Sequence, residues 1–183
     1  MTTYSARITP FSFRYVVTKD GEPAYEARIE STDLVFVDPE GNDVFGVEYR
    51  FPPSVEGFQF VDSETDEVFG RVVDDIALLG RRWTIHNGSG SKVATIRDKG
   101  TFRKLLYEIG LETTLPVPVV MEIVRPTGSV LGTVRRRVGV TKTVEIDLAY
   151  GSEFDERLAL GAALILDQED TETRELRALT WDD

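Results

Sequence analysis

The longest uninterrupted apolar run of the chain lies near its C-terminal end, within residues 154–167. No polar side chain intervenes over residues 158–166, so a helix here is apolar on every side and must be surrounded by protein. The run is well short of the roughly 20 apolar residues that a membrane-spanning helix needs. It therefore predicts a core helix, with Ser152 and Asp155 as its start signal. Gly161 costs about 1 kcal/mol relative to alanine inside a helix, which indicates that a bulky side chain or another backbone comes close there.

Most of the remaining chain consists of paired runs that alternate between apolar and polar residues, with a tight polar turn between the two runs. A unit of this kind predicts a β-hairpin. The unit occurs five times in succession, at residues 14–29, 34–47, 58–72, 83–96 and 121–134. One more alternating strand follows at residues 140–150.

The spacing of the copies widens before the last one, where about 13 extra residues fall within residues 101–116. Apolar residues at helical spacing predict a short amphipathic helix that stops at Gly110, and alternation over residues 105–109 leaves a strand as the alternative. The charged tail, residues 168–183, adds an edge strand or a short helix, or frays.

Roughly a dozen strands on one chain close most economically as a barrel, because closure leaves no bare sheet edge. We therefore predict a mostly β fold, a closed antiparallel β-barrel of roughly twelve strands wrapped around a central hydrophobic C-terminal helix. A chain of 183 residues with 41% hydrophobic content fits one domain. Its core spans about residues 12–167, followed by the acidic tail.

Charge is distributed unevenly over a chain whose net charge is -11. Residues 1–80 carry a balance of -10, residues 81–142 a balance of +8, and residues 143–183 a balance of -9. Scarce lysine and abundant carboxylates resemble the surfaces of proteins from salt-loving archaea, with an ordinary acidic cytoplasmic protein as the alternative. The basic middle segment is a candidate anion-binding surface, since Arg offers paired donors to carboxylates and phosphates. The alternative is a set of ordinary surface ion pairs of small energy.

The candidate anion-binding residues are the densest basic positions of this segment: Arg81, Arg82, Arg103, Lys104, Arg135, Arg136, Arg137 and Lys142. On a strand, Arg135 and Arg137 share one face and Arg136 takes the other. An inward Arg136 would meet the apolar helix at high cost unless it is paired. A local bulge at Arg136 is therefore the prediction.

No constellation of residues argues for catalysis, a metal or a cofactor. The chain has no cysteine and one histidine, His86, which has no local carboxylate or second histidine as a partner. Asp62 begins a stretch that resembles the start of a calcium loop, but Glu67 stands where that loop needs Gly. The Gly-rich residues 87–92 lack the Gly-Lys-Ser/Thr ending of a phosphate loop. We predict a chain without catalytic residues, metal or cofactor.

The hairpins and the apolar helix together resemble the tubby-like superfamily, and within it the LURP-one-related proteins, with phospholipid scramblases as relatives. The resemblance covers roughly residues 12–167. It rests on the turn and strand residues Asp38, Gly41, Val44, Asp62, Val68, Gly90, Val93 and Gly128, and on the helix at residues 154–167. Thr65 and Arg125 depart from the repeat at its turns. The resemblance implies a twelve-stranded barrel around a hydrophobic helix, in agreement with the pattern.

The expected function is that of a non-catalytic binding or scaffold protein of the LURP-one-related type. Its basic segment, residues 81–142, would contact anionic phospholipid headgroups or a protein partner. No nucleic acid and no transmembrane span are expected, and the chain is expected in the cytoplasm or peripheral to a membrane. The alternatives are a membrane-associated scramblase-like protein and an enzyme with a site at the barrel rim.

Overall fold

The computed structural model describes residues 1–9, 14–31, 33–50, 57–77, 80–98, 119–137, 142–149 and 154–179. They form twelve strands and the helix α2 (Glu156–Leu179). The strands are β1 (Thr2–Thr9), β2 (Arg14–Lys19), β3 (Glu22–Glu30), β4 (Asp33–Val37), β5 (Asp43–Arg50), β6 (Gly57–Asp62), β7 (Val68–Ala77), β8 (Gly80–Asn87), β9 (Lys92–Asp98), β10 (Val119–Val124), β11 (Val130–Arg137) and β12 (Thr143–Leu148).

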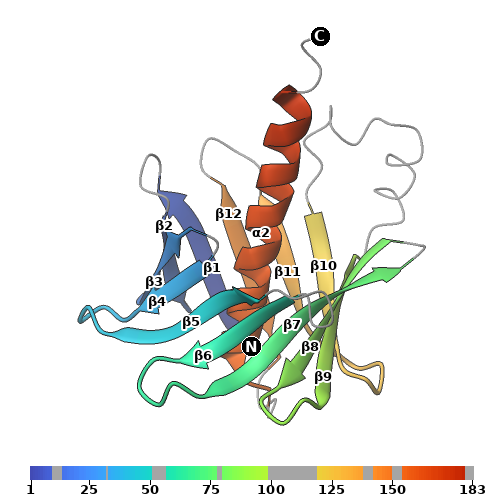
Figure 1. The fold of residues 1–183 in the computed structure, drawn as a ribbon, viewed down its shortest axis with the longest axis horizontal. Helices are drawn as coiled ribbons and strands as arrows, with labels where there is room; N and C mark the ends of the chain where they lie inside the picture. The colour runs from blue at the N-terminus through green and yellow to red at the C-terminus, as the bar shows by residue number, and fades with distance from the viewer. Residues whose placement is uncertain are drawn as a thin grey trace.

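Each strand pairs antiparallel with its neighbours in the chain, and β1 pairs with β12, so the sheet closes into a barrel around α2 (Figure 1). The predicted fold class is confirmed. The five predicted hairpins are β2–β3, β4–β5, β6–β7, β8–β9 and β10–β11, and the strand expected at residues 140–150 is β12. The alternating pattern predicted these pairs because each strand has one face on the core and one face outside.

The hairpin turns explain one departure from the repeat. In the β4–β5 turn, Gly41 takes a φ of 94° and donates its N–H to the carbonyl of Asp38. In the β6–β7 turn the hydrogen bond reaches one residue further, from the N–H of Asp66 to the carbonyl of Asp62. The left-handed position moves to Asp66, whose φ is 57°. Thr65 therefore replaces the expected Gly without strain, because it no longer occupies the left-handed position.

The bore of the barrel is filled by the apolar part of α2. Its apolar side chains over residues 158–166 are at most 6% exposed, and they pack against inward residues of the surrounding strands. Gly161 faces Phe60, where an added Cβ would lie 2.4 Å from the ring. The close approach that the sequence predicted at Gly161 is confirmed.

The helix differs from its predicted bounds at both ends. Its N-cap is Asp155, whose Oδ1 accepts the N–H of Arg157 at 2.9 Å, so the helix begins at Glu156. The predicted cap, Ser152, lies outside the described residues. At the other end the helix continues to Leu179, so most of the predicted tail extends α2, which runs beyond the strands in Figure 1.

Part of the predicted organisation lies outside the described residues, including the helix expected before Gly110 and the end of the tail. Of the helices that the described residues form, none has the length and hydropathy needed to cross a membrane.

Candidate functional site

The three consecutive arginines of β11 alternate between the outside and the inside of the barrel. Arg135 and Arg137 have side chains that are 51% and 70% exposed, whereas Arg136 is buried. Arg135 forms an ion pair with Asp147 at 3.4 Å, and Arg137 forms one with Glu145 at 3.1 Å. The predicted sharing of a face by Arg135 and Arg137 is confirmed.

The predicted bulge at Arg136 is wrong. Pairing with β12 is continuous from Gly132 to Arg137, so Arg136 points into the bore. Its Nε lies 2.5 Å from Oδ1 of Asp167 on α2, and its Nη2 donates to the Asp167 carbonyl at 3.3 Å. The inward guanidinium is tolerated because the helix supplies the opposite charge at that level.

A tyrosine completes this buried contact. The hydroxyl of Tyr15 donates to Oδ2 of Asp167 at 2.8 Å, and Tyr15 itself is 1% exposed. Burial and the neighbouring Asp167 charge raise the pKa of Tyr15 well above its ordinary value, so its hydroxyl stays protonated. Tyr15, Arg136 and Asp167 thus connect α2 to β2 and β11 by polar contacts inside the bore.

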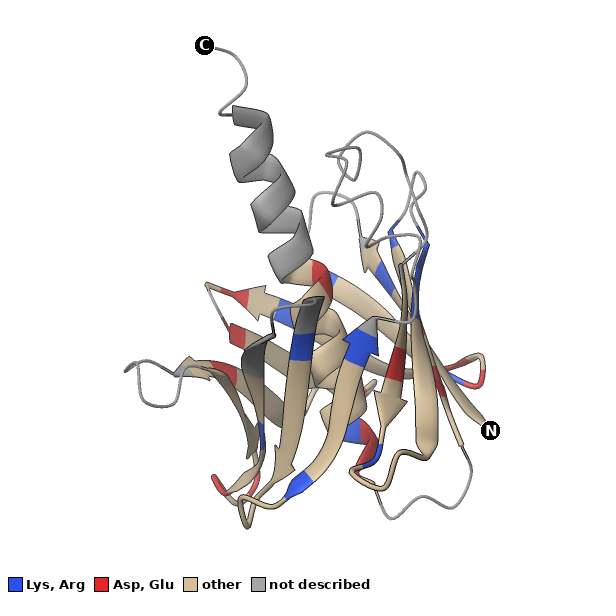
Figure 2. Ribbon diagram, turned by 90° about the vertical axis from the view of Figure 1, so that its right-hand side faces the viewer, with Lys and Arg blue, Asp and Glu red and all other residues tan. Residues whose placement is uncertain are grey.

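Among the described candidates, Arg82 lies on β8, three strands away from β11. Arg82 and Arg97 face each other across β8 and β9, and both are exposed. Arg97 forms an ion pair with Glu122 of β10 at 3.2 Å, which places a carboxylate between this pair and β11. Figure 2 shows basic and acidic residues interspersed over the barrel wall. Among the described residues of segment 81–142, Arg97, Arg135 and Arg137 each hold a carboxylate of a neighbouring strand.

Four other candidates contribute little to this picture. Lys142 precedes β12 and is half-buried, and its carbonyl accepts the N–H of Ile8 at 3.2 Å. The backbone of Arg81 belongs to β8. Arg103 and Lys104 lie outside the described residues. Anion binding by the exposed arginines stays a prediction, whereas Arg136 has a structural role inside the bore.

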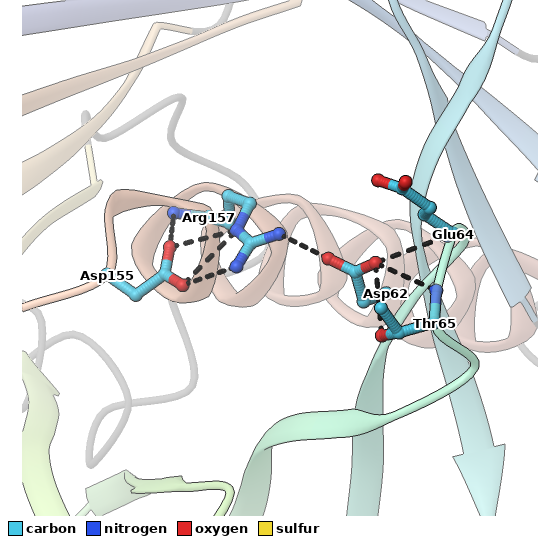
Figure 3. Close-up of polar contacts among 5 residues, drawn as sticks. All are labelled: Asp62, Glu64, Thr65, Asp155 and Arg157. Carbon is cyan, nitrogen blue, oxygen red and sulfur yellow. Dashed lines mark hydrogen bonds and ion pairs between the residues drawn. The ribbon is translucent and has the colours of Figure 1, made fainter.

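The start of α2 carries a second polar cluster, which Figure 3 shows. The Arg157 guanidinium donates to Asp155 at 2.8 Å and to Oδ2 of Asp62, in the β6–β7 turn, at 3.0 Å. Oδ1 of Asp62 accepts the backbone N–H groups of Glu64 and Thr65. The hydrogen bond from Arg157, followed by those from the turn, holds the pKa of Asp62 below its ordinary value.

Two neighbouring contacts secure the same end of the helix. The Arg157 guanidinium lies 4.0 Å from the centre of the Phe69 ring. Glu156 accepts hydrogen bonds from the Lys19 ammonium at 2.7 Å and from the Tyr4 hydroxyl at 2.6 Å. Partial burial opposes ionisation of Glu156, but these two donors hold its pKa below its ordinary value.

These clusters were not predicted. Asp155 was assigned only to the start signal of the helix, and Asp62 to a turn. The signal was the run of charged residues 155–157 directly before an apolar helix that had to enter a barrel. Charges at that point need partners from the surrounding hairpins, because the helix end is partly enclosed.

The residues weighed for catalysis or metal binding have structural partners. His86 Nδ1 lies 3.0 Å from the carbonyl of Gly90 in its own hairpin turn. Asp62 binds its turn and Arg157, as described above. Within the described part of the chain, no three His, Asp or Glu side chains are grouped as metal ligands.

The comparisons with known proteins support the fold. No family model matches the chain, and no curated protein matches it. The X-ray structure of a protein from Arabidopsis thaliana, itself LURP-one-related, is similar with a TM-score of 0.57 and 13% sequence identity. The match covers 92% of this chain and 91% of that chain. At this identity the similarity shows the fold alone, and function has to be argued from the residues.

Proposed function

We propose that this chain is a non-catalytic binding protein of the LURP-one-related type, which holds an anionic partner on the outer surface of its barrel. One observation carries the proposal: the apolar side chains of residues 158–166 fill the bore and are at most 6% exposed. A β-barrel that carries a small molecule keeps a cavity for it. Here the helix takes that volume, which leaves the outer wall as the surface for recognition.

The outer wall has suitable chemistry for an anionic partner. Arg97, Arg135 and Arg137 have side chains that are 53%, 51% and 70% exposed. Each already holds a carboxylate of the chain itself, so its geometry suits an acidic group. Exposed ion pairs contribute about 0–1 kcal/mol, and a partner's carboxylate or phosphate can therefore replace them at small cost.

The experiment measures binding to two anionic probes at low and high NaCl. The probes are phosphatidylcholine vesicles with added phosphatidylserine, and soluble poly-glutamate. Wild type is compared with the triple variant Arg82→Ala, Arg97→Ala and Arg135→Ala. Arg71→Ala is the control, because Arg71 is exposed on β7 outside the basic segment.

The proposal predicts that wild type binds at least one anionic probe at low salt and loses this binding at high salt, because screening weakens exposed charge pairs. Neutral phosphatidylcholine vesicles should not bind. Absence of binding to every anionic probe at low salt would contradict the proposal. Retained binding by the triple variant would place the contact elsewhere on the barrel wall.

A further inference from the structure

Closure of the barrel brings an N-terminal arginine beside the arginines of β11. Thr143 of β12 pairs with Arg137 of β11 on one side and with Arg7 of β1 on the other. Both arginines are exposed, and their side chains point outward because Arg136 and Ala6, their chain neighbours, are buried. Residues that lie 130 positions apart in the sequence thus share one row of the outer wall.

The row continues onto β2 and β3. Arg7 pairs with Val16, and one step further toward the same end of the barrel Arg14 pairs with Arg28. The side chains of Arg14 and Arg28 are 47% and 49% exposed. We name Arg137, Arg7, Arg14 and Arg28 the seam strip, because it crosses the junction of β1 with β12.

The arginines of the seam strip differ in the carboxylates that lie beside them. Glu26 accepts hydrogen bonds from Arg14 at 3.2 Å and from Arg28 at 2.9 Å, and Glu145 pairs with Arg137. Glu30 and Asp43 also lie near enough to Arg28 to stabilise its charge. The Arg7 side chain, by contrast, forms no hydrogen bond or ion pair with another described side chain. On a protein whose net charge is -11, Arg7 is therefore the position in the strip whose charge is left to attract an anion.

The shape of the strip distinguishes between kinds of anionic partner. It crosses five neighbouring strands, from β11 to β3, so its length is about 19 Å at about 4.8 Å per strand spacing. In a closed barrel of twelve strands, neighbours are about 30° apart around the axis, and the two ends of the strip point about 120° apart. A flat membrane touches only a few strands of such a convex wall. An extended polypeptide can follow the curve.

An apolar residue adds to the preference for a polypeptide. Val16 is 47% exposed and lies between Arg7 and Arg14 on the outer face. An apolar side chain of a partner can bury it, while flanking carboxylates reach the arginines. Glu26 shows that one carboxylate can be held by two arginines of the strip at once.

Building on the proposed function, we infer that the seam strip binds an extended, carboxylate-rich polypeptide segment of a partner protein, with an apolar side chain placed against Val16. At about 3.3 Å per residue, about six extended residues span the strip. The site is separate from Arg82 and Arg97 and uses three arginines that precede the basic segment.

The test measures binding of a fluorescent peptide of about eight residues, glutamate throughout except for a central leucine, by anisotropy at low NaCl. A second peptide carries glutamine in place of glutamate. The seam variant is Arg7→Ala with Arg14→Ala. The control is Arg71→Ala with Arg125→Ala, two exposed arginines away from the strip.

We expect wild type and the control to bind the glutamate peptide equally, and the seam variant to bind it at least tenfold more weakly. The glutamine peptide should not bind. Val16→Ser should weaken binding of the leucine peptide and leave binding of an all-glutamate peptide unchanged. Thermal unfolding of the seam variant should match wild type, because both substituted side chains are exposed.

Several results would overturn the inference. Equal peptide binding by wild type and seam variant would do so while leaving the proposed function intact. Preferential binding of wild type to anionic vesicles, lost in the seam variant, would make the strip a lipid site. Dimers in wild type that dissociate in the seam variant would make it a contact between copies. Absence of binding to every anionic probe would contradict the proposed function as well.

Discussion

The Arg136 guanidinium and the Asp167 carboxylate form an ion pair inside the barrel, where their side chains are 6% and 2% exposed. Asp167 ends the apolar part of α2, and Arg136 belongs to β11, so the pair fixes the height of the helix in the bore. Tyr15 donates to the same carboxylate from β2. The position of the helix along the barrel axis therefore depends on a specific polar contact in addition to apolar packing, which is less directional.

Removal of Arg136 alone should destabilise the protein strongly. Arg136→Met leaves the Asp167 carboxylate buried without its counterion, and breaking a buried pair in this way costs about 3–5 kcal/mol. Urea unfolding measures the change. Arg137→Met is the matched control, because that pair is exposed and contributes about 0–1 kcal/mol.

Removal of the whole contact separates pairing from packing. The triple variant Tyr15→Phe, Arg136→Met and Asp167→Leu removes all three polar side chains of this contact together, so it should recover most of the stability that Arg136→Met loses. If the triple variant were as unstable as the single one, shape rather than charge compensation would explain the role of Arg136.

Gly161→Ala should destabilise the protein although alanine favours helix. The added Cβ would lie 2.4 Å from Cε1 of Phe60 and 3.0 Å from Cγ2 of Val47, and both neighbours are buried. Overpacking of this kind costs about 1–3 kcal/mol, against a gain of about 1 kcal/mol in helix propensity. We expect a lower melting temperature. Gly46→Ala is the control, since its Cβ would meet only a carbonyl at 3.8 Å.

Leu164→Glu should unfold the protein. Leu164 is fully buried, so the change removes about 1.5–3 kcal/mol of apolar burial and places an unpaired charge in the core. Circular dichroism would show loss of the native spectrum. Val130→Glu is the control, because Val130 is 50% exposed and should tolerate the charge. A Leu164→Glu variant that melts like wild type would disprove the central position of the helix.

The contact between Asp62 and Arg157 should contribute to the loss of stability in acid. The pKa of Asp62 is lowered in the folded protein. The ionised carboxylate therefore stabilises the fold fully above the ordinary aspartate pKa of about 3.9. This stabilisation declines as the pH falls below that value and is absent below the folded pKa. Asp62→Asn should therefore be less stable than wild type at pH 7 and lose less stability on acidification. Parallel pH profiles for the two proteins would contradict this assignment.

The fold was largely predictable because its signals are local. Each hairpin shows its own alternation and turn, and the apolar run over residues 158–166 has no other stable place than a core. The strand at residues 2–9 received no assignment, although it closes the barrel with β12. The C-terminal end of the helix was also missed, because the charged sequence after Asp167 has no apolar periodicity.

The candidate site was less predictable, because it depends on register between distant strands. Strand alternation correctly placed Arg135 and Arg137 on one face. A bulge was predicted at Arg136 because its partner Asp167 lies 31 positions away and was not recognised. Arg7 lies near Arg137 only because both residues pair with Thr143 of β12. The sequence of residues 81–142 alone could not indicate that Arg7 lies near this segment.

Hydrogen exchange of the wild-type protein, followed by mass spectrometry of peptides from α2, tests directly whether the helix fills the bore of the barrel. Amides over residues 158–166 should exchange only through global unfolding, because the barrel encloses this part of the helix on all sides. Their protection should disappear together with the barrel in urea. Exchange as fast as that of the hairpin turns at residues 38–42 and 88–91 would show that the helix leaves the bore, and would reopen the bore as a binding site.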